Sequence, residues 1–250
     1  MRGRHVVVTG AGRGIGKAIA VRLARDGATL SLLARGVDDL RATADEVGGA
    51  FVHGVDIRDR EAVDAGVAAA VDANGPIHAL VANSGIGGPN DAGVGDRFYD
   101  LVQTNLVGTY DCIRAAQRHL AAEGRRDVVV ISSILARIPV PGYTGYSASK
   151  AGLLGLVHSF AAELAPDDVQ VNAICPGWVA TNMAREGIGL LADDLGITYD
   201  DAYARAMDEV PLGRMSEPED IAGTVAWLLS ADARGVTGQA IDHNGGAFMV

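Results

Sequence analysis

Lysine is almost absent from this chain. Of the 21 lysine and arginine side chains among 250 residues, only Lys17 and Lys150 are lysines. A compact ammonium and a broad planar guanidinium fill different spaces, so arginine cannot freely replace a lysine that has a specific role. Lys150 lies one helical turn after Tyr146 and is therefore a candidate functional residue. The alternative is an ordinary solvated lysine on a helix surface.

Cysteine and long apolar runs are scarce as well. Cys112 and Cys175 are too few for a disulfide framework, and we expect both to be buried and reduced, as in a cytoplasmic protein. No apolar stretch approaches the length of a membrane span, and residues 1–4 run directly into a strand pattern, which predicts no signal peptide. The net charge of −10, without a basic stripe, argues against nucleic acid as a partner.

Strand-like and helical patterns alternate along the whole chain. We predict strands at 5–9, 28–33, 50–54, 78–82, 127–132, 168–174 and 237–241. We predict helices at 15–26, 37–47, 60–73, 96–122, 145–165 and 217–230. This alternation predicts a single α/β domain over residues 1–250, a doubly wound (Rossmann) fold whose parallel seven-stranded sheet carries helices on both faces.

One segment interrupts the alternation. Residues 182–215 form a long insertion, with a helix of their own at 198–209, which we interpret as a lid over the substrate. The alternative is a surface excursion that packs against a neighbouring subunit. The run Ser216-Glu217-Pro218-Glu219 predicts a capping box at the start of the last helix.

A glycine-rich turn follows the first predicted strand. It contains four alternating glycines with two larger residues between them: Gly10, Gly12, Arg13, Gly14, Ile15 and Gly16. Glycines remove the Cβ atoms that block close backbone approach, and the following helix offers free N–H groups and a positive dipole end. A plain strand-to-helix turn needs only one glycine, so the turn predicts a pyrophosphate site.

A second group of residues indicates proton transfer. Tyr146 and Lys150 share a helix face, and Ser133 closes an apolar strand pattern thirteen residues before the tyrosine. An isolated phenol, with a pKa of about 10, is a poor base near neutrality, and a nearby ammonium lowers that pKa. Tyr143 is a rival acid, but the residue four positions after it is Ser147 rather than a lysine.

Together these motifs resemble the short-chain dehydrogenase/reductase family, from about Val6 onward. The resemblance rests on separated motifs in the expected order: Thr9-Gly10-x-x-x-Gly14-x-Gly16, Asn83-Ser84-Gly85, Asn105, Ser133, Tyr146-x-x-x-Lys150 and Pro176-Gly177. It implies a nicotinamide coenzyme, reversible oxidation of an alcohol to a carbonyl, and a homotetramer. A weaker similarity, over residues 181–214, points to 3-oxoacyl and polyketide ketoreductases.

The resemblance implies four catalytic residues. Tyr146 is expected to act as general acid in reduction and general base in oxidation. Lys150 would tune Tyr146 and hold the nicotinamide ribose, and Ser133 would hydrogen-bond the substrate oxygen. Asn105 would link Lys150 to a proton-relay water, unless it is only a polar residue that bends its helix.

The end of the second predicted strand bears on the choice of coenzyme. In NAD-preferring members of the family an acidic residue stands here, whereas this chain has Ala34 followed by Arg35. Arg35, with help from Arg13, could pair with a 2′-phosphate, so we favour NADP(H) and keep NAD(H) as the alternative. The resemblance assigns further coenzyme contacts, with Asp56 at the adenine ring and Thr181 at the carboxamide: Asp56, Ile57, Asn83, Gly85, Pro176, Gly177, Val179 and Thr181.

The predicted substrate pocket is apolar. Its wall would include Leu135, Tyr143, Trp178 and the insertion, which suits a hydrophobic ketone or a 3-oxoacyl thioester. Trp178 could equally be a packing residue. No metal-binding motif is present, and residues 145–149 lack the final glycine of a serine-hydrolase elbow. The rivals are an NAD(H)-dependent alcohol or diol dehydrogenase, a nucleotide-sugar epimerase and a non-catalytic coenzyme-binding regulator.

Overall fold

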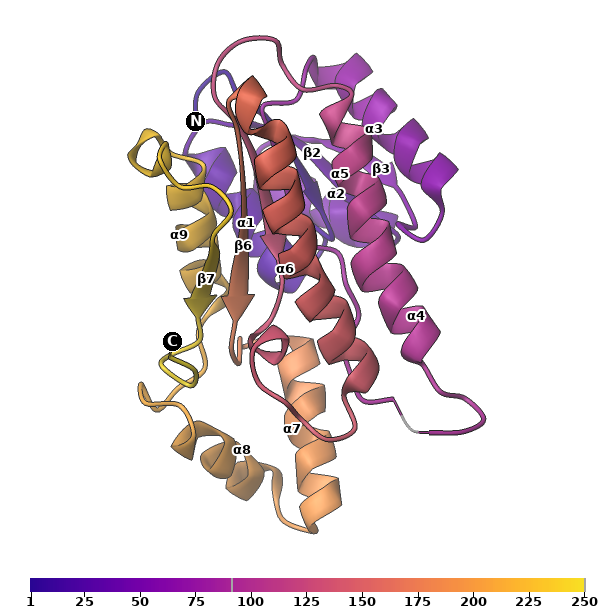
Figure 1. Ribbon diagram of the computed structural model, residues 1–250, viewed down its shortest axis with the longest axis vertical. Helices are drawn as coiled ribbons and strands as arrows, with labels where there is room; N and C mark the ends of the chain where they lie inside the picture. The colour runs from indigo at the N-terminus through magenta and orange to yellow at the C-terminus, as the bar shows by residue number, and fades with distance from the viewer. Residues whose placement is uncertain (91, 250) are drawn as a thin grey trace.

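The sheet has the predicted composition and direction. The computed structural model describes residues 1–90 and 92–249. All seven predicted strands are present and pair in parallel, in the order β3-β2-β1-β4-β5-β6-β7. Figure 1 labels β2, β3, β6 and β7 of this sheet. Their bounds are β1 His5–Thr9, β2 Thr29–Ala34, β3 Phe51–Gly54, β4 Ala79–Ala82, β5 Arg126–Ile131, β6 Val169–Pro176 and β7 Ala240–His243.

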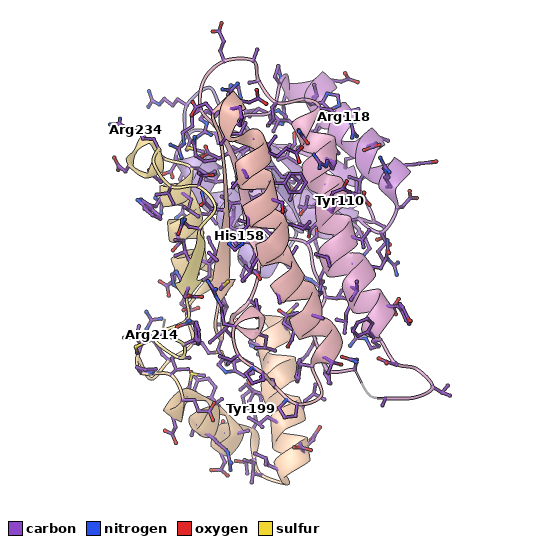
Figure 2. All side chains as sticks on the ribbon, in the orientation of Figure 1. Tyr110, Arg118, His158, Tyr199, Arg214 and Arg234 are labelled. Atoms are coloured by element: carbon purple, nitrogen blue, oxygen red, sulfur yellow. The ribbon has the colours of Figure 1, made fainter. Side chains whose placement is uncertain are left out.

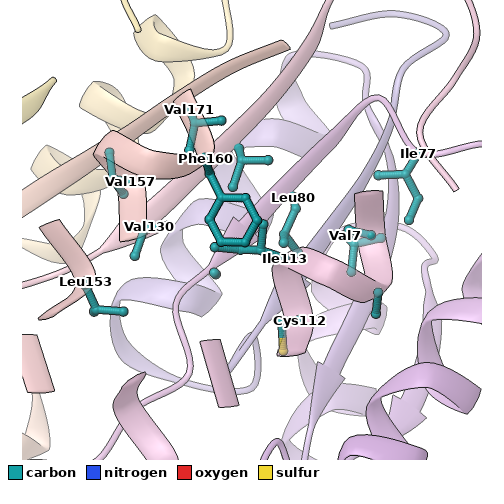
Figure 3. Packing of buried hydrophobic residues seen from close by; sticks show 14 of the residues in the cluster. Val7, Ile77, Leu80, Cys112, Ile113, Val130, Leu153, Val157, Phe160 and Val171 are labelled. Atoms are coloured by element: carbon teal, nitrogen blue, oxygen red, sulfur yellow. The ribbon is translucent and has the colours of Figure 1, made fainter. Parts of the chain in front are cut away.

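Helices cover both faces of this sheet. One face carries α1 (Gly14–Arg25), α2 (Val37–Glu46) and α9 (Pro218–Leu228), and the other carries α3 (Arg60–Asn74), α5 (Gly108–Gln117) and α6 (Thr144–Leu164). Strand β1 shows why two cores form, because successive side chains point to opposite faces. Val6 and Val8 pack with α1 and α9, whereas Val7 packs with α5 and α6, beside Phe160 and Leu80 (Figure 3).

Two predictions about helices differ from the structure. The predicted helix 96–122 is divided into α4 (Phe98–Val102), a π-helical turn (Gln103–Val107) and α5, which ends at Gln117. The capping box predicted from Ser216 is displaced by one residue. The N-cap is Glu217, whose N–H donates to the Asp220 carboxylate at 2.9 Å, and Pro218 fills the first helical position.

The insertion contains two helices rather than one. The predicted helix is present as α8 (Tyr199–Asp208), but α7 (Asn182–Leu195) precedes it and was missed. Thr181 caps α7 at its start, and Gly196 ends it with a left-handed φ of 63°. The two helices bury Ala184, Ile188 and Ala202 against one another and extend from the body at one end, where Figure 2 labels Tyr199.

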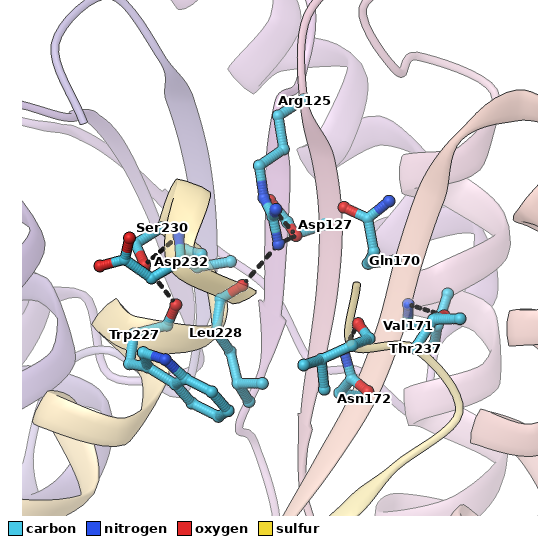
Figure 4. Close-up of polar contacts among 12 residues, drawn as sticks. Arg125, Asp127, Gln170, Val171, Asn172, Trp227, Leu228, Ser230, Asp232 and Thr237 are labelled. Carbon is cyan, nitrogen blue, oxygen red and sulfur yellow. Dashed lines mark hydrogen bonds and ion pairs between the residues drawn. The ribbon is translucent and has the colours of Figure 1, made fainter. Parts of the chain in front are cut away.

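The strand order defines where a ligand can bind. The connections reverse direction between β1 and β4, and in open α/β sheets the crevice at the carboxyl ends of such strands is the usual ligand site. Near the amino ends of the strands, on the side opposite this crevice, lies a buried cluster of charged side chains (Figure 4). Asp127 pairs with Arg4 at 2.6 Å and with Arg125 at 2.7 Å, and Arg125 also donates to the Leu228 carbonyl at 2.9 Å.

Candidate active site

The glycine turn lies at the carboxyl end of β1 and leaves room for a ligand. A Cβ on Gly16 would stand 2.1 Å from the Gly10 carbonyl oxygen, so α1 can approach β1 this closely only with glycine there. Gly14 opens α1 with a φ of +54°. Arg13, the N-cap residue, makes no side-chain cap, so the first N–H groups of α1 stay available. These residues fit a pyrophosphate group.

Asn83 fixes the shape of this turn from the neighbouring strand. Its side-chain amide donates to the carbonyl oxygens of Thr9 at 3.1 Å and Gly10 at 3.2 Å. Its backbone N–H donates to the Thr9 hydroxyl at 3.0 Å. The side-chain amide nitrogen of Asn83 therefore supports the glycine turn, and its contact with the coenzyme stays a prediction.

Ser133, Tyr146 and Lys150 converge at the carboxyl ends of the strands, on the same side of the sheet as the glycine turn. Ser133 follows β5, while Tyr146 and Lys150 lie in the first two turns of α6. The Lys150 ammonium lies 5.8 Å from the centroid of the Tyr146 ring and donates to the Ile131 carbonyl at 2.9 Å. Ser132 holds the helix to the strand, because its hydroxyl donates to the Lys150 carbonyl at 2.9 Å.

The electrostatics of this group differ from our expectation. Burial raises the pKa of the Tyr146 phenol, and contact with the Ser133 hydroxyl opposes that rise. The net shift is therefore upward, opposite to the lowering that we expected from the Lys150 ammonium. Lys150 as a whole is only 5% exposed, and burial lowers its pKa to about 8.

Asn105 occupies the π-helical turn and is fully buried. Its side-chain oxygen accepts from the Ile86 N–H at 2.8 Å, and its amide donates to the Ile86 carbonyl at 3.0 Å and the Ser149 hydroxyl at 3.1 Å. The Asn105 oxygen and the Lys150 ammonium lie 3.1 and 3.5 Å from the point where a Gly85 Cβ would stand. Asn105 and Lys150 thus flank Gly85, and π turns of this kind often mark functional sites.

The end of the cleft expected to hold the adenosine carries several charges. Arg35 and Arg13 are exposed, and among residues 1–90 and 92–249 neither makes a side-chain ion pair or hydrogen bond. Asp56 pairs with Arg58 at 2.6 Å, which lowers the pKa of the Asp56 carboxyl, with a smaller contribution from Arg35. Ile57 is 5% exposed and packs against α5.

The other wall of the cleft is formed by the loop after β6 and the start of α7. Pro176 ends β6, and the Gly177 N–H donates to the His243 carbonyl at 3.1 Å. Val179 is buried, and the Thr181 methyl group lies 3.3 Å from the point where a Gly14 Cβ would stand. Helix α7 therefore begins directly opposite the glycine turn.

The predicted pocket residues lie around Tyr146 with different roles. The Tyr143 ring meets the Tyr146 ring edge-on, with centroids 6.5 Å apart, and Leu135 is half-buried in the loop after Ser133. Trp178 packs against Gly187 of α7 and against the apolar cluster between α7 and α8, which favours the packing role. The described part of the chain has no cluster of metal-ligating side chains, and none of its helices is long and apolar enough to cross a membrane.

Three contacts around the cleft were not predicted. Arg58 neutralises Asp56, Met183 of α7 reaches across the cleft to Gly87, and Asn90 joins the loop after β4 to the start of α6. Met183 comes two residues after Thr181, the N-cap of α7, so its position in the first turn of a helix could be predicted from the sequence. The Asn90 contact spans 55 residues, and no local pattern indicates it.

Fold and cleft together are those of the dinucleotide-binding α/β class. A family described as enoyl-(acyl carrier protein) reductase matches residues 10–247. The L-rhamnose 1-dehydrogenase (NAD(P)(+)) of Azotobacter vinelandii is 37% identical, over 98% of this chain and 97% of the relative. The 3-oxoacyl-(acyl-carrier-protein) reductase FabG of Staphylococcus aureus is 32% identical, over 98% of each chain.

A solved structure agrees with these sequence matches. The actinorhodin polyketide ketoreductase with NADPH is 33% identical, with a TM-score of 0.91 over 98% of this chain and 97% of that one. The chain belongs to the short-chain dehydrogenase/reductase family. It is an oxidoreductase of the kind that acts on alcohol and keto groups, as expected from the sequence.

Proposed function

We propose that this protein is an NADP(H)-dependent reductase of hydrophobic ketones or 3-oxoacyl thioesters. The observation that carries the proposal is the convergence of Ser133, Tyr146 and Lys150 beside a glycine turn at the switch point of the sheet. Bound NADP(H) supplies the hydride for the carbonyl carbon.

The residues of α6 and β5 supply the proton and the positioning. Tyr146 donates its phenolic proton to the carbonyl oxygen and takes it back in the oxidative direction. Ser133 donates a hydrogen bond to the same oxygen, where negative charge develops. Lys150, whose ammonium donates to the Ile131 carbonyl, is placed to bind the ribose. The side-chain oxygen of Asn105 and this ammonium flank Gly85.

Arg35 supports NADP(H) over NAD(H). It follows directly on β2, where it is exposed and has no carboxylate partner within the described residues. Asp56, whose pKa the charge of Arg35 helps to lower, is already paired with Arg58. Arg35 can therefore accept the charge of a 2′-phosphate, while Asp56 and Arg58 remain as a neutral pair beside it.

Kinetics with both coenzymes test the proposal. We expect wild type to reduce members of a panel of 3-oxoacyl thioesters and cyclic ketones with NADPH. Arg35→Ala should lower kcat/KM for NADPH by roughly tenfold to a hundredfold, the value of a charge-assisted hydrogen bond of about 1.5–3 kcal/mol. The NADH value should be unchanged. Arg41→Ala, one turn into α2 and paired only with Asp38, is the matched control. A clear preference of wild type for NADH would refute the coenzyme assignment.

The second candidate is an alcohol or diol dehydrogenase that runs the same site oxidatively. It is favoured by the similarity to a rhamnose dehydrogenase that uses either coenzyme. The apolar character of Leu135, Tyr143 and the exposed Met183 argues for a less polar substrate than a sugar. Oxidation of sugars and diols, measured beside the ketone panel, separates the two candidates.

Assembly and compartment belong to the same proposal. We propose a cytoplasmic homotetramer. Tyr99, Val107 and Tyr110 are exposed along α4, the π turn and α5, which offers an apolar face for association (Figure 2 labels Tyr110). Both cysteines are buried and unpaired, as suits a reducing compartment. Light scattering of the purified protein tests the tetramer.

A further inference from the structure

We propose that Asn90 is a positioning residue for Tyr146, acting as an N-cap that the loop after β4 supplies to α6. This inference rests on the proposed function, because it concerns the residue assigned there as the proton donor. Asn90 itself does not face the reacting groups. It is 9% exposed, and its side chain is engaged by Asp96, Thr144 and Gly145.

Helix α6 begins without a cap of its own. Its N-cap residue, Tyr143, makes no side-chain hydrogen bond to the first turn. The side-chain oxygen of Asn90 instead accepts from the Gly145 N–H at 2.8 Å. A second bond ties the loop to the approach to α6, since the Asn90 N–H donates to the Gly142 carbonyl at 2.8 Å. Asn90 thus holds the chain on both sides of the helix start, directly before Tyr146.

Asp96 fixes which way the Asn90 amide faces. The Asn90 amide nitrogen donates to the Asp96 carboxylate at 3.0 Å and to the Thr144 hydroxyl at 3.0 Å. A carboxylate only accepts and a backbone N–H only donates, so these partners allow a single orientation of the amide. Asp96 is anchored in turn, because its carboxylate accepts from the Phe98 N–H at 2.9 Å.

Packing stops the first turn of α6 from moving sideways. A Cβ on Gly145 would stand 3.0 Å from the Phe98 Cα and 3.1 Å from a Leu101 methyl group, so α4 presses directly on this turn. One turn further along, the Ser149 hydroxyl donates to the Tyr146 carbonyl at 2.7 Å and accepts from Asn105. Asn90 therefore fixes the backbone just before Tyr146, and Asn105 fixes it from the following turn of α6, through Ser149.

Three variants test this role with substrate turnover. Asn90→Ala should lower kcat about tenfold to a hundredfold, the scale of a misplacement of about 1 Å, with the Kd for NADPH unchanged within about twofold. Asn90→Asp keeps the acceptor for Gly145 but places two carboxylates face to face. Its kcat should rise relative to wild type as the pH falls, because protonating one carboxylate restores the donor. The double variant Asn90→Asp with Asp96→Asn exchanges donor and acceptor and should recover most of the wild-type kcat.

A control separates positioning from general destabilisation. Asn172 is 2% exposed and bridges Val236 and Gln239 with its amide, away from the carboxyl edge of the sheet. Asn172→Ala should lose stability yet keep kcat per folded molecule. Unchanged kcat in Asn90→Ala, or a double variant no better than Asn90→Asp, would overturn the inference.

A spectroscopic readout stands apart from turnover. Ultraviolet titration of the phenolate, with Tyr146→Phe subtracted, reports the pKa of Tyr146 without any substrate. Burial raises that pKa, so a loosened first turn in Asn90→Ala should return it toward its ordinary value. If wild type reduces no carbonyl but this shift appears, the proposed function fails and the positioning role stands. If wild type is an active reductase and the pKa does not move, the positioning role fails.

Discussion

A methyl group on Gly14 should separate folding from coenzyme binding. Alanine at the φ of +54° found there costs about 1–2 kcal/mol in the left-handed region, and about 0.4–1 kcal/mol returns because the unfolded chain is restricted. The nearest atom to the new methyl group is the Thr181 methyl at 3.3 Å, which a small shift accommodates. Gly14→Ala should therefore fold, with a free energy of unfolding lower by about 1 kcal/mol.

The same methyl group would enter the gap between the glycine turn and the lid. That gap is where the pyrophosphate is proposed to lie, so we expect the Kd for NADPH to rise at least about tenfold, or about 1.4 kcal/mol. Gly16→Ala should lose both the stability of the fold and the affinity for NADPH. Its Cβ would stand 2.1 Å from the Gly10 oxygen and 2.5 Å from the Asn83 amide, and overpacking of this kind costs about 1–3 kcal/mol or more.

Gly223→Ala provides the matched control, in the middle of α9 with no atom closer than 3.8 Å. It should gain about 1 kcal/mol from helix propensity and bind NADPH as wild type does. Urea unfolding gives the free energies and titration calorimetry gives the affinities. Wild-type NADPH affinity in Gly14→Ala, with the fold intact, would refute the pyrophosphate site.

Two further predictions concern buried titratable groups. Burial lowers the pKa of Lys150 from 10.5 to about 8, so Lys150→Met should be inactive yet more stable than wild type at neutral pH. In urea unfolding, the difference in stability between the two proteins should narrow as the pH rises from about 8 to 10.5. A variant only as stable as wild type at neutral pH would contradict this. Burial also holds the pKa of His5 below 6.5, while its ring contacts Ser31 and the Gly75 carbonyl, so the unfolded chain takes up the proton first and stability falls as the pH drops below 6.5. His5→Gln should weaken that acid sensitivity in the same assay, and an unchanged pH profile would show that other groups cause it.

The strands, the helices of the body and the position of the glycine turn follow from local patterns. Val6, Val7 and Val8 are apolar because both faces of a central parallel strand are buried, and such runs can be recognised in a sequence. Helix α7 was also readable, since Thr181 and Gly196 are ordinary start and stop signals.

The remaining features depend on contacts between distant residues. The Asn105 turn could be suspected from a polar residue in a helical pattern, but its partners Ile86 and Ser149 could not. The pKa of Tyr146 depends on the burial of its phenol and on its contact with the Ser133 hydroxyl, neither of which the spacing of residues reports. Arg58 beside Asp56 is close in sequence, yet its pairing depends on the turn after β3.

Tyr146→Phe tests the central claim most directly. The change removes one hydroxyl and leaves the ring that packs beside Tyr143. Binding of NADPH by calorimetry and turnover of the best ketone should be measured on the same preparation. The account predicts a Kd equal to that of wild type and almost no turnover. Turnover near the wild-type rate would contradict it.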